Sequence, residues 1–233
     1  MSGYINDPRK NIHSLYYKEM IINPFLSTKN IPTTGLIATW KLDEGSGNII
    51  NESVSNLLTT SPYNVGWIPG INGTAIFTTY GGSYFRVENA EITKLYNGSV
   101  SVWAKTSNNS TGYRGIVVKQ NAYSIFLINN NVGLFNWQQM SSSVSQISIS
   151  DDIWHHIVLT FSSGILSGTK IYVDGELALT TTMTIQAQDV GIAVGEGSSI
   201  GEGQNFGGDI DEIKLYNRVL TSDEVLLLFH EFD

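Results

Sequence analysis

The sequence predicts an all-β protein in which two antiparallel sheets pack as a sandwich. From His155 to Phe161, odd and even positions alternate in the period-two pattern of a half-buried strand. Downstream, Asp174-Gly175 separates two β-prone runs, and this dipeptide is a strong hairpin signal because a type I′ turn needs positive φ at both positions. Other short apolar runs, bounded by Gly, Asn or Ser, follow at the spacing of a sandwich.

Composition limits the possible partners. The chain has 233 residues, enough for one full-size core, and its 13 basic against 21 acidic residues give a net charge of −8. The basic residues are scattered, which excludes nucleic acid as a partner. Cysteine is absent, so disulfides, thiolate metal sites and thiol catalysis are excluded. No segment approaches the roughly 18 apolar residues of a membrane span, and no signal peptide is visible.

Residues 1–34 form an irregular N-terminal arm. Pro8, Pro24 and Pro32 interrupt any regular element, although a short helix over about residues 14–22 is possible. The apolar residues of this helix are too many for a solvated tail. The arm therefore either packs along its own sandwich or anchors the chain to other subunits of a larger assembly.

The β pattern begins at Gly35. Leu36, Ala38 and Trp40 share one face of the first strand, which predicts that Trp40 lies in the core. Residues 51–73 are expected to be mostly loop. Later strands are expected at 74–78, 83–87, 99–105, 115–119, 123–128, 132–137, 146–149, 155–161, 171–173, 176–179 and 190–194. Alternation along this strand places Trp103 on the face opposite to that of Val100 and Val102. Its side chain then lies either on the outer surface of the sandwich or beneath another element.

The last strand is expected at residues 207–216. Ile210 is out of phase with Ile213, and a β-bulge at Asp211-Glu212 would return both to one face. A short C-terminal helix follows over residues 220–229. Its start carries the capping-box pattern of Thr221 with Glu224 three residues later.

Six stretches of the chain resemble, in order, the laminin G-like group of concanavalin A-like jelly rolls. They are GLIATWKLDEGSGN at 35–48, IPGINGTAIF at 68–77, SVSVWAK at 99–105, DDIWHHIVLTF at 151–161, KIYVDGELA at 170–178 and FGGDIDEIKLYNRVLTSDEV at 206–225. The resemblance implies one jelly-roll domain over residues 35–233. It also implies a module that binds glycans or proteins, often with calcium.

No pattern in the sequence favours an enzyme. Glycosidases on related jelly rolls carry paired carboxylates on one strand face, and the run from Asp209 to Glu212 lacks the leading Glu and the correct repeat. His155 and His156 are adjacent on a strand and point to opposite faces, so they cannot jointly hold one ion. The resemblance implies that this Trp-His-His run is scaffold.

Calcium is the one metal that the resemblance implies. In related jelly rolls a structural ion joins the first and last strands, which points to Asp43, Asp209 and Asp211 in this sequence. The alternative is that these acids cap turns and the bulge.

Glycan binding needs an exposed aromatic ring beside polar groups. The candidates are aromatic residues with polar neighbours: Trp67, Tyr80, Tyr84, Tyr113, Trp137 and Phe206. Trp137 is the best of them because it ends a strand and precedes Gln138-Gln139. Packing at the core or rim is the alternative for each.

These patterns lead to the hypothesis of a non-catalytic recognition module for carbohydrate or a cell-surface protein. An apolar arm without a signal peptide suits an extracellular or virion-surface protein, such as a phage tail, fibre or capsid-decorating component. A secreted bacterial adhesin is a further alternative for the location. The alternatives are a purely structural assembly protein and, third, a glycan-degrading enzyme.

Overall fold

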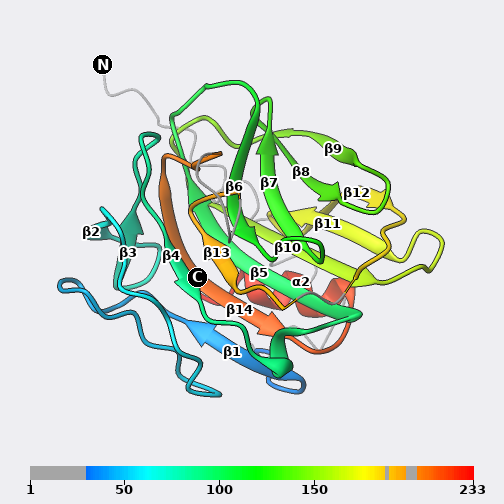
Figure 1. The fold of residues 1–233 in the computed structure, drawn as a ribbon, viewed down its shortest axis with the longest axis horizontal. Helices are drawn as coiled ribbons and strands as arrows, with labels where there is room; N and C mark the ends of the chain where they lie inside the picture. Colours follow the sequence, from blue (N-terminus) through cyan, green and yellow to red (C-terminus); the bar gives the residue numbers. More distant parts are fainter. Residues whose placement is uncertain (1–29, 187–188, 198–203) are drawn as a thin grey trace.

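The protein is a sandwich of two antiparallel β-sheets, as predicted (Figure 1). The computed structural model describes residues 30–186, 189–197 and 204–233. Among them no helix is both long and apolar enough to cross a bilayer. The larger sheet runs in the order β12 (Glu176–Thr181), β11 (Thr169–Val173), β10 (His155–Ser162), β5 (Asn97–Lys105), β14 (Asp209–Tyr216), β3 (Thr74–Phe77) and β2 (Gly66–Pro69), with β1 (Leu36–Trp40) also paired to β14.

The smaller sheet has six strands and begins and ends at short or polar edges. Its order is β4 (Phe85–Val87), β13 (Ile192–Val194), β6 (Tyr113–Val118), β7 (Ser124–Ile128), β8 (Asn131–Asn136) and β9 (Ser141–Ser148). A single 3₁₀ turn, η2 (Glu91–Thr93), precedes β5. The apolar face of each sheet meets the other, and the interior includes Trp40, which is 2% exposed as predicted.

One expectation about the first strand is wrong. A bulge between Leu36 and Ala38 breaks the expected parity, so Leu36 packs outside the sandwich while Ile37 and Ala38 both enter the core. Residues 51–73 are mostly loop, as expected, and include the short strand β2, in which Trp67 and Ile68 pair with β3 at the sheet edge. Neither the bulge nor strand β2 shows in alternation alone, since both depend on the neighbouring strand.

The C-terminal helix covers the outer face of the larger sheet. Helix α2 (Ser222–Phe229) starts with the predicted capping box, in which Thr221 and Glu224 exchange side-chain bonds to backbone N–H groups. Its buried face packs on outward side chains of β10, β11 and β14. Trp103 lies on this face and stacks on Phe229 at 5.8 Å. The helix therefore hides one of the two outer faces of the sandwich.

Strand β14 carries the predicted bulge. Its pairing with β5 shifts register between Asp211 and Lys214, and Glu212 has φ 47°. On its other side, β14 pairs with β3 before the bulge and with β1 after it. The bulge therefore lies where the neighbour of β14 changes.

Only the end of the N-terminal arm is described. The carbonyl of Pro32 accepts a hydrogen bond from the Tyr216 hydroxyl at 3.0 Å, and that of Thr34 accepts one from Arg218 at 2.7 Å. Ile31 packs beside helix α2. The expected helix near residues 14–22 and the rest of the arm lie outside the described residues.

One buried carboxylate ties the long loop after β1 to that strand. The two oxygens of Glu52 accept four backbone N–H groups, those of Thr39, Val54, Ser55 and Leu57, at 2.7–3.1 Å. Glu52 is 7% exposed. These four backbone N–H groups thus find their acceptor in the Glu52 carboxylate, whereas in a strand or helix a backbone carbonyl would accept them.

Replacing Glu52 should therefore destabilise the fold. Glu52→Ala leaves four backbone donors without their acceptor, and we expect a loss of about 2–4 kcal/mol in the free energy of unfolding. Glu88→Ala is the matched control: Glu88 is exposed, and its loss should cost less than about 0.5 kcal/mol. Urea unfolding of both variants measures the difference, and equal stabilities would contradict the role given to Glu52.

Candidate functional site

The outer face of the six-stranded sheet carries a pocket of about 250 Å³, here called the aromatic pocket. Its lining residues are Tyr113, Phe126, Phe135, Trp137, Gly197 and Gln204. The four aromatic residues come from the strands β6, β7 and β8 and from the turn that follows β8. They point away from the core between the sheets and form a separate apolar cluster with Val118, Ile128 and Val144.

Two glycines make room for the pocket. On the central strand β7, Phe126 pairs with Gly115 of β6 on one side and with Gly133 of β8 on the other. A glycine adds no side chain beside the Phe126 ring, so neighbouring aromatic side chains can lean over it. Tyr113 does so at a ring-centroid distance of 5.8 Å.

The rings of the aromatic pocket stand at steep angles to one another. Tyr113 meets Phe126 at 85° and Phe135 at 84°, and Phe135 meets Trp137 at 75°. Edge-to-face contacts of this kind are favourable because the positive edge of one ring faces the negative face of the next. The rings therefore hold each other in place and enclose a hollow rather than forming one flat surface.

The rim of the aromatic pocket is built on close backbone packing. Gly115 donates its N–H to the carbonyl of Gln204 at 2.7 Å, and a Cβ at Gly115 would lie 2.4 Å from the carbonyl oxygen of Glu196. Only glycine lets the segment at Glu196 and Gly197 approach β6 so closely. This packing brings the Gln204 side chain to the edge of the pocket.

A side-chain turn positions Trp137. The Asn136 carboxamide oxygen accepts the N–H groups of Gln138 and Gln139 at 3.1 and 3.4 Å, an arrangement that turns the chain directly after β8. Asn136 is buried, and Trp137 is half-buried. The Trp137 ring is thus held against Phe135 while part of it stays exposed.

The structure brings together two of the six predicted aromatic residues. Tyr113 and Trp137 line the aromatic pocket, whereas Phe126, Phe135 and Gln204 were not among the candidates. A signal for the missed residues exists in the sequence. The run from Ser124 to Ile128 is almost continuously apolar, which indicates a strand covered on both faces, and Phe135 shares parity with Trp137.

The other predicted aromatic residues lie elsewhere. Trp67 packs against the core, Tyr84 stacks on Tyr63 at 5.4 Å, and Tyr80 is 54% exposed in the loop after β3. The prediction that Phe206 binds a ligand is wrong: its exposed fraction is 0%, because its ring belongs to the core between the sheets. It cannot offer a face to a ligand.

The three carboxylates that the resemblance assigned to calcium each have a protein partner. Asp211 is fully buried and accepts the N–H groups of Ile71 and Asn72, and Asp43 accepts that of Thr74 at 3.0 Å. Asp209 pairs with Lys105 at 2.8 Å. Thus Asp43 and Asp211 hold the same turn, between β2 and β3.

The fit of these carboxylates to a metal is poor. Burial raises the pKa of Asp211 to about 8, although the backbone donors favour its ionised form. Over the described ranges, no three His, Cys, Asp or Glu side chains are grouped to hold a metal ion. Calcium at these positions remains a prediction.

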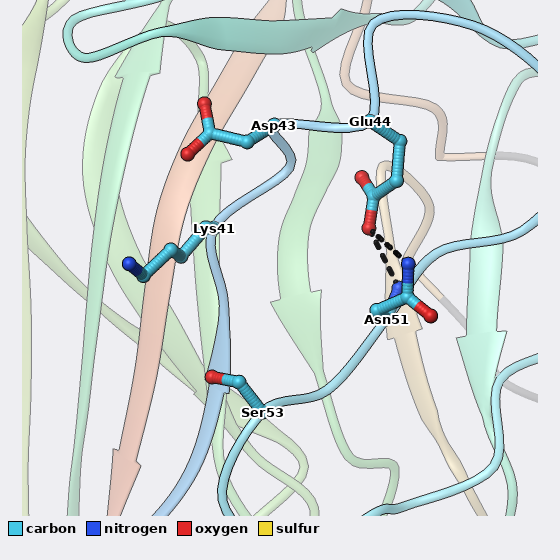
Figure 2. A pocket seen from close by; sticks show the side chains of 5 residues that line it. All are labelled: Lys41, Asp43, Glu44, Asn51 and Ser53. Atoms are coloured by element: carbon cyan, nitrogen blue, oxygen red, sulfur yellow. Dashed lines mark hydrogen bonds between the residues drawn. The ribbon is translucent and has the colours of Figure 1, made fainter.

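A second pocket, here called the polar pocket, lies at the end of β1. It measures about 260 Å³ and is lined by Lys41, Asp43, Glu44, Asn51 and Ser53 (Figure 2). Glu44 points toward Asn51 and accepts both its backbone and side-chain N–H groups, at 2.8 and 3.0 Å (Figure 2). Asp43 turns away from this pair. Two acids that face apart, beside a lysine, do not form a cation cage.

The adjacent histidines serve opposite sides of strand β10, as parity predicts. The two ring nitrogens of His155 face Asp174 at 2.7 Å and Asp151 at 3.1 Å, whereas His156 bonds to the Ser101 hydroxyl at 2.8 Å under the C-terminal residues. Burial lowers the pKa of His156 to about 3. Burial also opposes the charge on His155, but its two carboxylate partners raise its pKa overall.

The fold defines a class of protein. A sandwich of two antiparallel sheets with a short C-terminal helix has the architecture of a jelly roll. A family model described as the concanavalin A-like lectin/glucanases superfamily, of the laminin G type, matches residues 79–226, which is more than half of the chain. The chain belongs to this family. The first two of the six resembling stretches lie before the matched region.

Solved structures share this fold at low sequence identity. The binding domain of Paraclostridial Mosquitocidal Protein 1 aligns with a TM-score of 0.67 and 16% identity over 85% of this chain and 52% of its own. Domain 4 of AbnA, an extracellular arabinanase from Geobacillus stearothermophilus in complex with arabinotriose, aligns with a TM-score of 0.62 and 20% identity over 82% of this chain and 96% of its own.

A sialidase of Trypanosoma rangeli in complex with sialic acid aligns with a TM-score of 0.67 and 16% identity over 85% of this chain and 33% of its own. The chain thus spans about half of the toxin binding domain and a third of the sialidase. Comparison with curated protein sequences gives no match.

The raised pKa of His155 predicts a pH-dependent contribution to stability. A group whose folded-state pKa is raised stabilises the fold fully below its unfolded pKa, about 6.5, and loses this contribution as pH rises through the folded value. Because Asp151 is about half exposed, we expect Asp151→Asn to cost only about 0.5–1 kcal/mol at pH 5.5.

Asp151→Asn should then cost less at pH 9 than at pH 5.5, because His155 loses its charge as the pH rises through its folded pKa. The measurement is urea unfolding at several pH values for the wild type and the variant. Asp152→Asn is the control, since Asp152 is exposed and has no contact with His155. A cost of Asp151→Asn that is the same at both pH values would contradict this assignment.

Proposed function

We propose that this protein is a non-catalytic recognition module that binds a carbohydrate through the aromatic pocket. One observation carries the proposal: four aromatic rings from three neighbouring strands and the turn after them converge in one hollow on the outer face of the six-stranded sheet. Apolar faces of sugar rings stack on aromatic side chains, and polar groups beside the rings bind the hydroxyls. Tyr113, Trp137 and Gln204 provide such polar groups.

The solved structures with this fold support the proposal. Two of them are described as binding domains of a mosquitocidal protein and of botulinum neurotoxin serotype D, and one is an arabinanase domain in complex with arabinotriose. The proposal extends to a cell-surface receptor that presents such a glycan. We infer that the chain acts by binding rather than by catalysis, because no carboxylate or histidine lines the described part of the aromatic pocket.

The location on a virion surface and the attachment through residues 1–34 remain proposals. The described end of this arm already packs on its own sandwich, through Pro32 and Thr34. The useful truncation therefore removes residues 1–29 alone. If the arm anchors a larger assembly, this variant stays folded and monomeric while the full chain associates; identical sizes in light scattering would contradict the anchoring role.

The main prediction concerns Trp137. Trp137→Ala removes the half-exposed ring at the mouth of the aromatic pocket, and we expect glycan binding to weaken by about 2 kcal/mol, or roughly thirtyfold in Kd. The experiment first finds a retained glycan on an array with the wild type, then compares affinities by calorimetry. Tyr96→Ala is the matched control, because Tyr96 is 53% exposed and does not line the aromatic pocket.

The outcomes separate the possible functions. Weaker binding in Trp137→Ala, with Tyr96→Ala unchanged, supports the aromatic pocket. Equal affinities of both variants would move the site elsewhere on the protein. No retained glycan, combined with self-assembly, would favour the structural role. Repeating the same glycan array with a chelator tests the calcium prediction. Loss of protein retention on the array would show that glycan binding needs a metal ion.

A further inference from the structure

The aromatic pocket differs from the rest of this acidic protein because its described lining carries no charge. The chain has a net charge of −8. The polar groups at the pocket are neutral: the Tyr113 hydroxyl, the Trp137 indole N–H and the Gln204 amide. Within the described part of the chain, no hydrogen bond joins any of these three side-chain groups to another residue.

The charged residues nearest in sequence are used elsewhere. Arg114 follows Tyr113, but its exposed fraction is 0%, and its guanidinium donates to the Asn130 carboxamide at 2.7 Å and to the Phe206 carbonyl. Glu196 precedes Gly197, and its carboxylate binds Arg86 at 2.7 Å. Neither group is available to pair with a ligand in the pocket.

The size and shape of the aromatic pocket limit how much ligand it can hold. Its volume of about 250 Å³ lies below the roughly 300–1,000 Å³ of pockets that enclose drug-sized ligands. Its rings meet at 75–85°, so they cannot form the single plane on which a long polymer chain would lie flat. A hollow of this size and shape has room for one sugar ring of a ligand.

We propose that the aromatic pocket takes a single uncharged sugar ring and excludes sugars that carry a carboxylate, such as uronic and sialic acids. This inference rests on the proposed function and adds the class of ligand. A carboxylate placed against these rings would lose its water and would meet only neutral donors, with no cation in the described lining to offset its charge. Hydroxyl groups, in contrast, find neutral donors and acceptors at Tyr113, Trp137 and Gln204.

The test compares paired glycans that differ by one carboxylate. The full-length protein is titrated with oligosaccharides that end in glucose or glucuronic acid, in galactose or galacturonic acid, and in neutral or sialylated units. We expect the neutral member of a bound pair to bind at least about tenfold more tightly. Its affinity should change less than about twofold between low and about 0.5 M salt, because no ion pair contributes.

A charge added at the rim provides the matched variants. Gln204 is exposed, so Gln204→Lys and Gln204→Glu should both fold. Gln204→Lys brings a cation to the pocket and should improve binding of the acidic partner by about threefold or more at low salt, whereas Gln204→Glu should weaken it further. A merely structural role of Gln204 would affect both members of each pair equally.

Failure of this inference differs from failure of the proposed function. If acidic glycans bind as well as neutral ones, and Trp137→Ala abolishes this binding, the aromatic pocket is a glycan site and the neutral-sugar inference is wrong. If no glycan binds, or if Trp137→Ala leaves every affinity unchanged, the proposed function fails and this inference fails with it.

Discussion

Strand β14 joins the first and last parts of the chain, and the rest of the sandwich depends on it. It pairs with β5 along one edge and with β3 and then β1 along the other. The bulge at Asp211 and Glu212 makes this change of neighbour possible while Ile210, Ile213 and Leu215 all stay in the core. At the same point the buried Asp211 carboxylate accepts backbone N–H groups of the turn between β2 and β3, and so ties that turn to β14.

The two outer faces of the sandwich have different roles because of what covers them. Helix α2 and the residues after it bury Trp103 and His156 on the larger sheet, so the aromatic groups there serve stability. Among the described residues, no helix covers Tyr113, Phe135 and Trp137 on the six-stranded sheet, and these side chains stay half-buried. Aromatic residues of similar character therefore become scaffold on one face and a candidate binding surface on the other.

Many local elements were predictable because their signals lie within a few residues. The positive φ values of Asp174 and Gly175, 51° and 82°, confirm the turn that this dipeptide favours. The capping box of α2 and the bulge in β14 were confirmed for the same reason. The error at Leu36 arose where the pairing partner, distant in sequence, decides the conformation.

The sequence by itself determined the fold class, the alternation of most strands, the family and the presence of aromatic residues at strand ends. Only the tertiary structure decided which of these aromatic residues meet. Phe126 and Phe135 join Tyr113 and Trp137 because glycines flank Phe126 in the register of β6, β7 and β8, and that register depends on pairing between strands. Phe206, with an equally promising sequence context, is buried instead, because the chain before β14 turns its ring between the sheets.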